Sequence, residues 1–159
     1  MAQRKQQRED DRMNLLTHSL HPLFDSLPTE TQQSLQEHVH PMQLQPGELL
    51  FAANTPATLF AIIHTGHVRI ELPYQDQKVV IQTIGPGEAI GWSWMEPPYQ
   101  WQFSAQAVDA VSGIWFDADW LRRQCEKDRI LHMAVLHLLL QTVSERLTAT
   151  RLRLLDCYK

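Results

Sequence analysis

The apolar positions of the chain change their period twice, from helical spacing to short alternating runs and back to helical spacing. Near the N-terminus, Thr29 followed by Gln32 forms a capping-box pattern for a short helix that ends near Val39. A preceding helix is predicted from apolar residues three to four positions apart, which are Leu16, Leu20, Leu23 and Phe24. Two helices are therefore expected before the first strand.

The middle of the chain reads as short strands separated by turn residues. The predicted strands are Glu48–Ala52, Leu59–His64, His67–Leu72, Lys78–Ile84, a Trp-rich run, and Trp101–Phe116. In one of these runs Val68, Ile70 and Leu72 alternate with polar residues, so one face is expected to be buried and the other wet. The lack of interleaved helices argues against a βαβ fold, and a jelly-roll sandwich or barrel of about residues 44–116 is predicted.

Two C-terminal helices, covering about residues 117–156, follow from their caps. Asp117 is placed to cap a short helix that runs to about Glu126, and Asp128 to cap a longer one that runs to about Asp156. Along the longer helix, apolar residues fall at a and d positions of a heptad repeat, interleaved with Thr150 and Cys157. We predict a dimer interface made by Met133, Leu136, Leu140, Val143, Leu147 and Leu154. The alternative is that this stripe only packs on the chain's own strands.

Composition narrows the class of protein. The chain has 159 residues, 43% apolar and 20% charged, which suits one soluble domain. A net charge of −4 without a basic face gives no sign of nucleic-acid binding. Residues 1–12 are predicted to be a disordered mixed-charge tail, with one domain over 13–159. No run is long enough to span a bilayer, so the cytoplasm is the expected location. Cys125 and Cys157 are expected to be reduced.

The segment from Ile84 to Ala110, IGPGEAIGWSWMEPPYQWQFSAQAVDA, combines a Gly-Pro turn, a Trp-rich stretch and a small-residue strand. It resembles the phosphate-binding cassette of cyclic nucleotide-binding domains, and the flanking chain resembles the Crp/Fnr superfamily from about His21 onward. The resemblance implies a mainly β fold, a double-stranded β-roll with flanking helices. It also implies that two copies pair through the long C-terminal helix, in a regulatory role in signal transduction.

The residues that define the cassette are replaced. Gly87-Glu88 matches its first pair and Gly91 its second glycine, but Trp92 stands where the resemblance places the ribose-binding Glu, and Phe103 or Ser104 where it places the phosphate-binding Arg. An Arg–phosphate bond contributes about 1.5–3 kcal/mol. Losing both contacts should weaken nucleotide binding by roughly two orders of magnitude or more.

A degenerate pocket is therefore predicted, for a neutral or apolar ligand. Its expected residues are Gly87, Glu88, Ile90, Gly91, Trp92, Ser93, Ser104, Ala105, Gln106 and Thr150, the last because the resemblance places a nucleotide-contacting threonine there. The aromatic cluster of Trp92, Trp94, Tyr99 and Trp101 either stacks a ligand or fills the space of one. Arg146, Arg151 and Arg153 are interpreted as cations that suit the negative end of the helix dipole.

We interpret the chain as a non-catalytic regulatory or ligand-sensing module, without metal or cofactor. In Crp/Fnr regulators a winged helix-turn-helix begins beyond this helix, so its lack here predicts no direct nucleic-acid binding, and output through a protein partner. No catalytic motif is present. Two alternatives stay open. One is a cupin-like metal enzyme that uses His64, His67 and Glu71. The other is a free-standing cyclic nucleotide sensor that binds through backbone N–H groups of residues 87–92.

Overall fold

A computed structural model describes residues 1–17 and 20–159, and the side chains of residues 11–19 are outside the description. Its centre is a roll of two antiparallel four-stranded sheets. One sheet has the order β1 (His40–Leu44), β8 (Val111–Asp117), β3 (Leu59–Thr65), β6 (Ala89–Ile90). The other has the order β2 (Leu49–Phe51), β7 (Ser104–Ala107), β4 (Val68–Tyr74), β5 (Gln77–Ile84). The predicted fold class, a β-roll with flanking helices and a long C-terminal helix, is confirmed.

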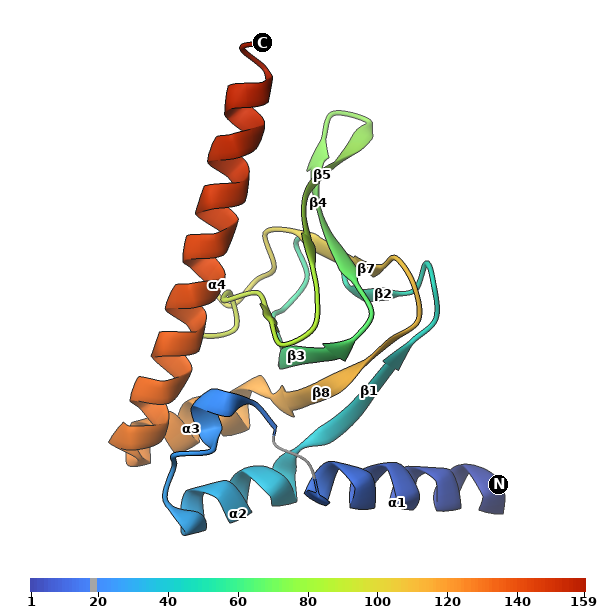
Figure 1. Cartoon of the computed structure of the whole chain (residues 1–159), viewed down its shortest axis with the longest axis vertical. Coiled ribbons are helices and arrows are strands. Elements are labelled where there is room, and N and C mark those ends of the chain that lie inside the picture. Colours follow the sequence, from blue (N-terminus) through green and yellow to red (C-terminus); the bar gives the residue numbers. More distant parts are fainter. Residues whose placement is uncertain (18–19) are drawn as a thin grey trace.

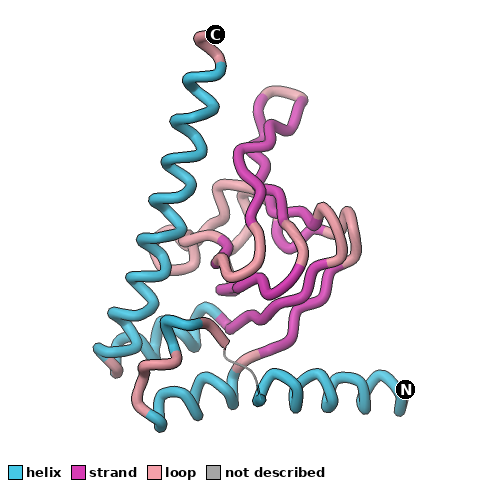
Figure 2. Tube along the Cα trace, viewed as in Figure 1, coloured by secondary structure: helices cyan, strands magenta, loops and turns pink. Residues whose placement is uncertain are grey.

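Helices lie at one end and along one side of the roll. The N-terminal elements are α1 (Ala2–Thr17), the 3-10 helix η1 (Pro22–Phe24) and α2 (Thr29–His38), and the C-terminal ones are α3 (Ala118–Lys127) and α4 (Arg129–Asp156). Figure 1 shows α4 running beside the roll, with the β4–β5 hairpin extending in the same direction. In Figure 2 loops of the roll reach toward the middle of α4. Among the described residues, none of these helices has the length and apolarity needed to cross a bilayer.

Several predicted strand boundaries are wrong. The roll begins at β1, four residues earlier than expected, where Met42 is buried and pairs with Gly113. The Trp-rich run after Gly91 forms turns and bends instead of a strand, because Gly91 has a positive φ and two prolines interrupt the backbone pattern. The run Trp101–Phe116 divides into β7 and β8.

The N-terminal expectations also need correction. Residues 2–17 form helix α1 where a disordered tail was predicted for residues 1–12, in keeping with their many helix-forming Gln, Arg, Lys and Glu residues. Of the expected first helix, Leu23 and Phe24 lie in η1, and the side chain of Leu16 lies outside the described residues. The capping box at Thr29 does not form, since the N-cap is Pro28 and the Gln32 amide donates to the Asp25 and Leu27 carbonyl oxygens.

The C-terminal caps are confirmed. The Asp117 carboxylate accepts from Trp120 N–H, and the Asp128 carboxylate accepts from Ile130 and Leu131 N–H. These bonds satisfy backbone donors at the first turns of α3 and α4. The Thr31 hydroxyl also donates to Asp128 at 2.6 Å, which ties α2 to the start of α4.

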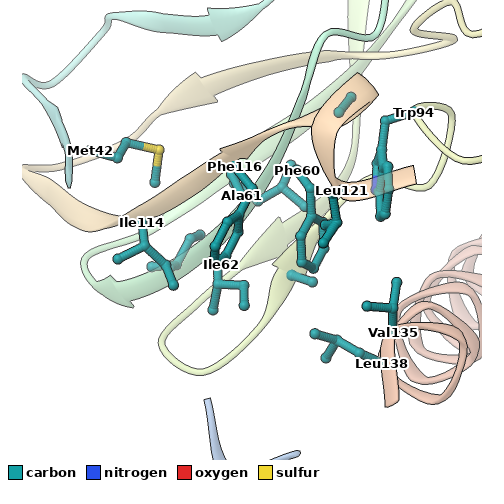
Figure 3. Close-up of a cluster of buried hydrophobic side chains, with 14 of the residues drawn as sticks. Met42, Phe60, Ala61, Ile62, Trp94, Ile114, Phe116, Leu121, Val135 and Leu138 are labelled. Carbon is teal, nitrogen blue, oxygen red and sulfur yellow. The ribbon is translucent and has the colours of Figure 1, made fainter. Parts of the chain in front are cut away.

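The core joins the roll to the first half of α4. Phe60, Phe116 and Trp94 are fully buried in one cluster, with Phe60 and Trp94 ring centroids 4.9 Å apart. Figure 3 shows Val135 and Leu138 of α4 on the side of this cluster occupied by Phe60 and Leu121. Each fully buried side chain of this kind contributes about 1.5–3 kcal/mol. The first half of α4 is therefore part of the domain's own core.

Helix α4 carries two different faces. The roll-facing positions are buried, and they are Leu131, Val135, Leu138, Leu139, Thr142 and Arg146. The predicted interface residues are exposed on another face, and they are Met133, Leu136, Leu140, Val143, Leu147 and Leu154. Leu140 is 65% exposed and Met133 68% exposed. The heptad positions therefore do not pack on the chain's own strands, which removes that alternative.

Candidate functional site: an aromatic cavity between the cassette and the long helix

The turn after β5 is built around Glu88. Its carboxylate accepts from Gly85 N–H at 2.5 Å, and Gly87 N–H donates to the Ile63 carbonyl. The His21 ring accepts from Leu23 N–H through Nδ1, so its Nε2–H donates to the Gly87 carbonyl oxygen at 3.0 Å. Burial of the ring lowers the pKa of His21. The turn is thus held by its own carboxylate and by the segment between α1 and α2.

After β6 the chain turns at Gly91 into the aromatic stretch. Gly91 has a φ of +74°, and a Cβ built on it would lie 2.5 Å from Cζ3 of Trp101. Trp101 is 3% exposed and stacks on Phe51, with ring centroids 3.7 Å apart and planes 6° from parallel. The Trp101 ring therefore lies directly on the backbone of the second cassette glycine, a contact that only glycine allows.

A cavity of about 10 Å³ remains beside these rings. It is lined by Phe51, Ile70, Gly91, Trp92, Ser93, Trp101, Phe103 and Arg146. A space of that size holds about one water molecule. In this conformation the aromatic side chains fill the pocket. The sequence had left open whether they would stack on a ligand or occupy its space.

Arg146 of α4 closes the cavity, and the sequence analysis missed it. The side chain is 5% exposed, and its Nε–H donates to the Gln82 amide oxygen at 3.1 Å. The guanidinium carbon lies 4.7 Å from the Trp92 ring centroid and 5.4 Å from that of Phe103. Burial lowers the pKa of Arg146 to about 10, while the charge of Glu88 acts in the opposite direction. It remains a cation at neutral pH.

Arg146 could have been found from its register. The buried positions of α4 continue every three or four residues from Leu131 through Thr142 to Arg146, so this arginine belongs to the roll-facing stripe. Assigning it to the helix dipole ignored that periodicity. Next to it, the Glu145 carboxyl has a raised pKa because of partial burial and a hydrogen bond with Glu88. Two consecutive residues of α4 thus engage the cassette.

The other predicted pocket residues have separate positions. Gly91, Trp92 and Ser93 line the cavity, whereas Gly87 is exposed and Ile90 pairs with Ala61 in the sheet. Four further positions do not line the cavity. Ala105 is buried in the core, and the Ser104 hydroxyl accepts from Ala53 N–H. The Gln106 side chain bonds to Arg69 and to the Gly47 carbonyl oxygen, while Thr150 is exposed and its hydroxyl donates to the Arg146 carbonyl oxygen. The predicted neutral polar lining is therefore not assembled.

The proposed metal ligands do not converge. The His64 ring bonds to the Leu20 carbonyl oxygen at 3.2 Å, and His67 Nδ1 lies 2.8 Å from Asp109 Oδ2. Glu71, predicted on the wet face, is 3% exposed, because the β4–β5 pairing shifts register between Ile70 and Glu71. Its carboxylate pairs with Arg69 Nε at 2.6 Å. In the described part of the chain, no group of three His, Cys, Asp or Glu residues could hold a metal ion.

The structure is a β-roll of two antiparallel sheets with a long C-terminal helix beside it, and the cavity lies between the two. The sequence profile of the cyclic nucleotide-binding domain matches residues 41–128. The chain belongs to the cyclic nucleotide-binding domain family. No curated protein matches it. The expected family is thereby confirmed, and the cupin-like enzyme is not favoured.

Solved structures share this fold at low sequence identity. A cyclic nucleotide-binding domain from Methylobacillus flagellatus is 20% identical with a TM-score of 0.71, over 95% of this chain and 84% of that one. The sensor domain of the transcriptional regulator DNR from Pseudomonas aeruginosa is 22% identical with a TM-score of 0.66, over 85% and 90%. Thermus thermophilus catabolite activator protein is 20% identical with a TM-score of 0.65, over 85% and 63%.

A cyclic nucleotide does not fit the cavity as it stands. Phe103 is one of the two positions expected for the phosphate-binding arginine, and Trp92 is the position expected for the ribose-binding glutamate. Both rings line the cavity. A space of about 10 Å³ excludes a nucleotide unless several rings move. In this conformation the cavity is therefore too small for the ligand after which the family is named.

Proposed function

We propose that this domain is a non-catalytic sensor in which occupancy of the aromatic cavity changes the position of α4, and that it acts in the cytoplasm as a homodimer without a cofactor. The observation that carries the proposal is Arg146, which belongs to α4 and yet forms a wall of the cavity. Any ligand that enlarges the cavity must displace this side chain or the rings against it. Ligand binding and helix position are thus physically linked.

The homodimer is supported by the exposed heptad face of α4. Its apolar side chains repeat at a and d spacing over most of the helix, the pattern typical of helices that pair. A row of exposed leucines is costly in water, and pairing with a second copy would bury it. Because α4 also forms the cavity wall, we infer that output is a change in protein contacts, either within the dimer or with a further protein partner.

Isothermal titration of cyclic AMP and cyclic GMP into the purified protein tests this function, with the mass in solution measured beforehand. We expect a dimeric mass and no heat from either nucleotide. Micromolar binding, about −8 kcal/mol, would show that the family's usual ligand is accepted despite Trp92 and Phe103. In that case the domain is a cyclic nucleotide sensor. A monomeric mass at all concentrations would refute pairing through α4.

A further inference from the structure

The cavity contains a buried cation whose hydrogen-bonding capacity is incompletely used. The Nη2 atom of Arg146 is buried and has no hydrogen-bond partner. Arginine offers five N–H donors in a planar fork. Here Nε uses Gln82, and the faces of Trp92 and Phe103 lie beside the guanidinium. Buried polar groups are nearly always bonded, so an unpartnered guanidinium nitrogen calls for an explanation.

No carboxylate compensates this charge directly. Among the described residues, Arg146 has no ion pair within 4.0 Å; the described pairs involve other residues. Glu88 influences Arg146 through its charge, but its carboxylate bonds to Gly85 N–H and to Glu145. Isolated buried charges are strongly unfavourable unless they are paired. Arg146 is therefore a buried cation without a directly bonded carboxylate, and the charge of Glu88 offsets its burial only in part.

The position of the guanidinium suits an incoming anion. Arg146 lines the cavity together with Gly91 and Ser93, and aromatic rings form most of the other walls. A guanidinium binds carboxylate and phosphate through paired charge-assisted hydrogen bonds. Flat aromatic walls favour a planar or apolar body next to the charged group. Trp92 and Phe103 are only partly buried, so they are the walls that can move outward.

We propose that Arg146 is the anchor for a small anionic ligand, whose single carboxylate or phosphate binds the guanidinium while its planar or apolar body displaces Trp92 or Phe103. This inference rests on the sensor function proposed above and names the ligand class of that site. It revises the neutral ligand expected from the sequence. The cation missing from the strand side of the cassette is supplied instead by α4, so the anion would contact the output helix directly.

The test titrates ¹⁵N-labelled full-length protein with three anions: sodium benzoate, sodium phosphate and cyclic AMP. Sodium chloride at equal ionic strength gives the baseline. Two readouts are followed, the tryptophan fluorescence and the Arg146 Nε–H resonance, which is assigned by its disappearance in Arg146→Gln. We expect a saturable change in both for at least one probe. Benzoate and phosphate separate a carboxylate from a phosphate ligand.

Two variants carry the comparison. Arg146→Gln should weaken the responding probe at least tenfold, since a charge-assisted bond contributes about 1.5–3 kcal/mol and 1.4 kcal/mol corresponds to tenfold. Arg151→Gln removes the same charge from an exposed position on the same helix and should bind as the wild type does. Equal affinity in Arg146→Gln and the wild type would overturn the proposal, as would the lack of any saturable response.

A third variant keeps the test independent of folding defects. Arg146→Met replaces the buried charge by an unbranched apolar side chain, so its melting temperature without probe should equal or exceed that of the wild type. The responding probe should raise the melting temperature of the wild type only. Adenosine, which carries no charge, separates the two proposals. If it shifts the wild type and Arg146→Gln alike while the anions do nothing, the sensor stands and the anion anchor is refuted.

Discussion

At the scale of single residues, Gly91 couples the cassette backbone to the aromatic filling of the pocket. Its φ of +74° disfavours any L side chain, and a Cβ would meet Trp101 at 2.5 Å. Gly87, in the same loop, has a φ of +83°, but a Cβ placed on it would meet no atom within 4 Å. A side chain at Gly87 would therefore cost stability through backbone conformation alone, whereas one at Gly91 would also cost stability through its contact with Trp101.

We expect Gly87→Ala to lower the free energy of unfolding by about 1–2 kcal/mol, the cost of a left-handed conformation. Gly91→Ala should lower it by about 1–3 kcal/mol more, because the added methyl group forces Trp101 off Phe51. Urea unfolding followed by tryptophan fluorescence measures both. Equal losses in the two variants would mean that Trp101 yields without cost.

Residue roles were only partly predictable from the sequence. Trp92 was predicted in the pocket from the cassette register, and the structure puts it in the cavity wall. Of the two positions considered for the missing arginine, Ser104 was predicted in the pocket, but it is Phe103 that lines the cavity. Arg146 was not predicted in the pocket, because the cassette pattern covers one continuous segment and Arg146 belongs to a helix that follows later in the chain. The polar contacts of Ser104 and Gln106 are made to distant backbone groups, and spacing along the chain does not reveal such pairings.

At the scale of elements, the junction between α3 and α4 depends on Asp128. Its carboxylate caps α4 and also accepts from Thr31 of α2. These hydrogen bonds lower the pKa of Asp128, the Thr31 hydroxyl contributing most. A carboxyl with a lowered folded-state pKa stabilises the fold above its unfolded-state pKa, and this contribution is lost as the pH falls through the folded value.

Asp128→Ala should therefore lower the free energy of unfolding at neutral pH by about 1–2 kcal/mol, the usual effect of losing an N-cap. The gap from the wild type should narrow as the pH falls below the unperturbed pKa of Asp, about 3.9, and should close below the lower pKa of Asp128 in the folded protein. Urea unfolding at a series of pH values measures the gap.

Thr31→Val is the matched variant, because it keeps the cap and removes only the bond from α2. It should cost about 0.5–1.5 kcal/mol. A gap between Asp128→Ala and the wild type that stays constant with pH would show that the cap does not depend on the ionised carboxylate.

Helices that begin at an aspartate cap were predicted well, whereas the helical spacing from Leu16 to Phe24 and the capping box at Thr29 were misleading. The starts of α3 and α4 follow directly from their aspartate caps. Strand β1 was missed because its residues, His40 to Leu44, show only one fully buried apolar side chain. The Trp-rich run was assigned to a strand because aromatics favour strands. In the structure Trp94 is buried by packing on Phe60, outside any ladder.

At the scale of the whole molecule, the exposed heptad face of α4 is the surface through which we propose that two copies of the domain pair. Leu140 is central in that face, whereas Gln141 is an exposed neighbour on the same helix that lies off the a and d positions. An aspartate at position 140 would bury a charge in a helix pair, while one at position 141 would remain in water.

Leu140→Asp should raise the dimer dissociation constant at least tenfold, and Gln141→Asp should leave it near that of the wild type. Sedimentation velocity over a range of protein concentrations measures the constants, and urea unfolding of each variant reports on its fold. If Leu140→Asp had the same dimer dissociation constant as the wild type, the contact between copies would lie on another surface.

The uneven packing of α4 has a mechanical consequence. Its first half is fixed by Leu131, Val135 and Leu138, whereas the residues after Arg146 are exposed, apart from partly covered Ala149. At 1.5 Å per residue, the arm from Arg146 to Asp156 is about 15 Å long. Under the proposed function, a tilt of α4 would turn about this packed first half, and it would also move the hydrogen bond from Arg153 to the Val80 carbonyl oxygen of β5. A small tilt of α4 near the cavity would become a larger displacement of its C-terminal end near Asp156, and this displacement is therefore easiest to measure there.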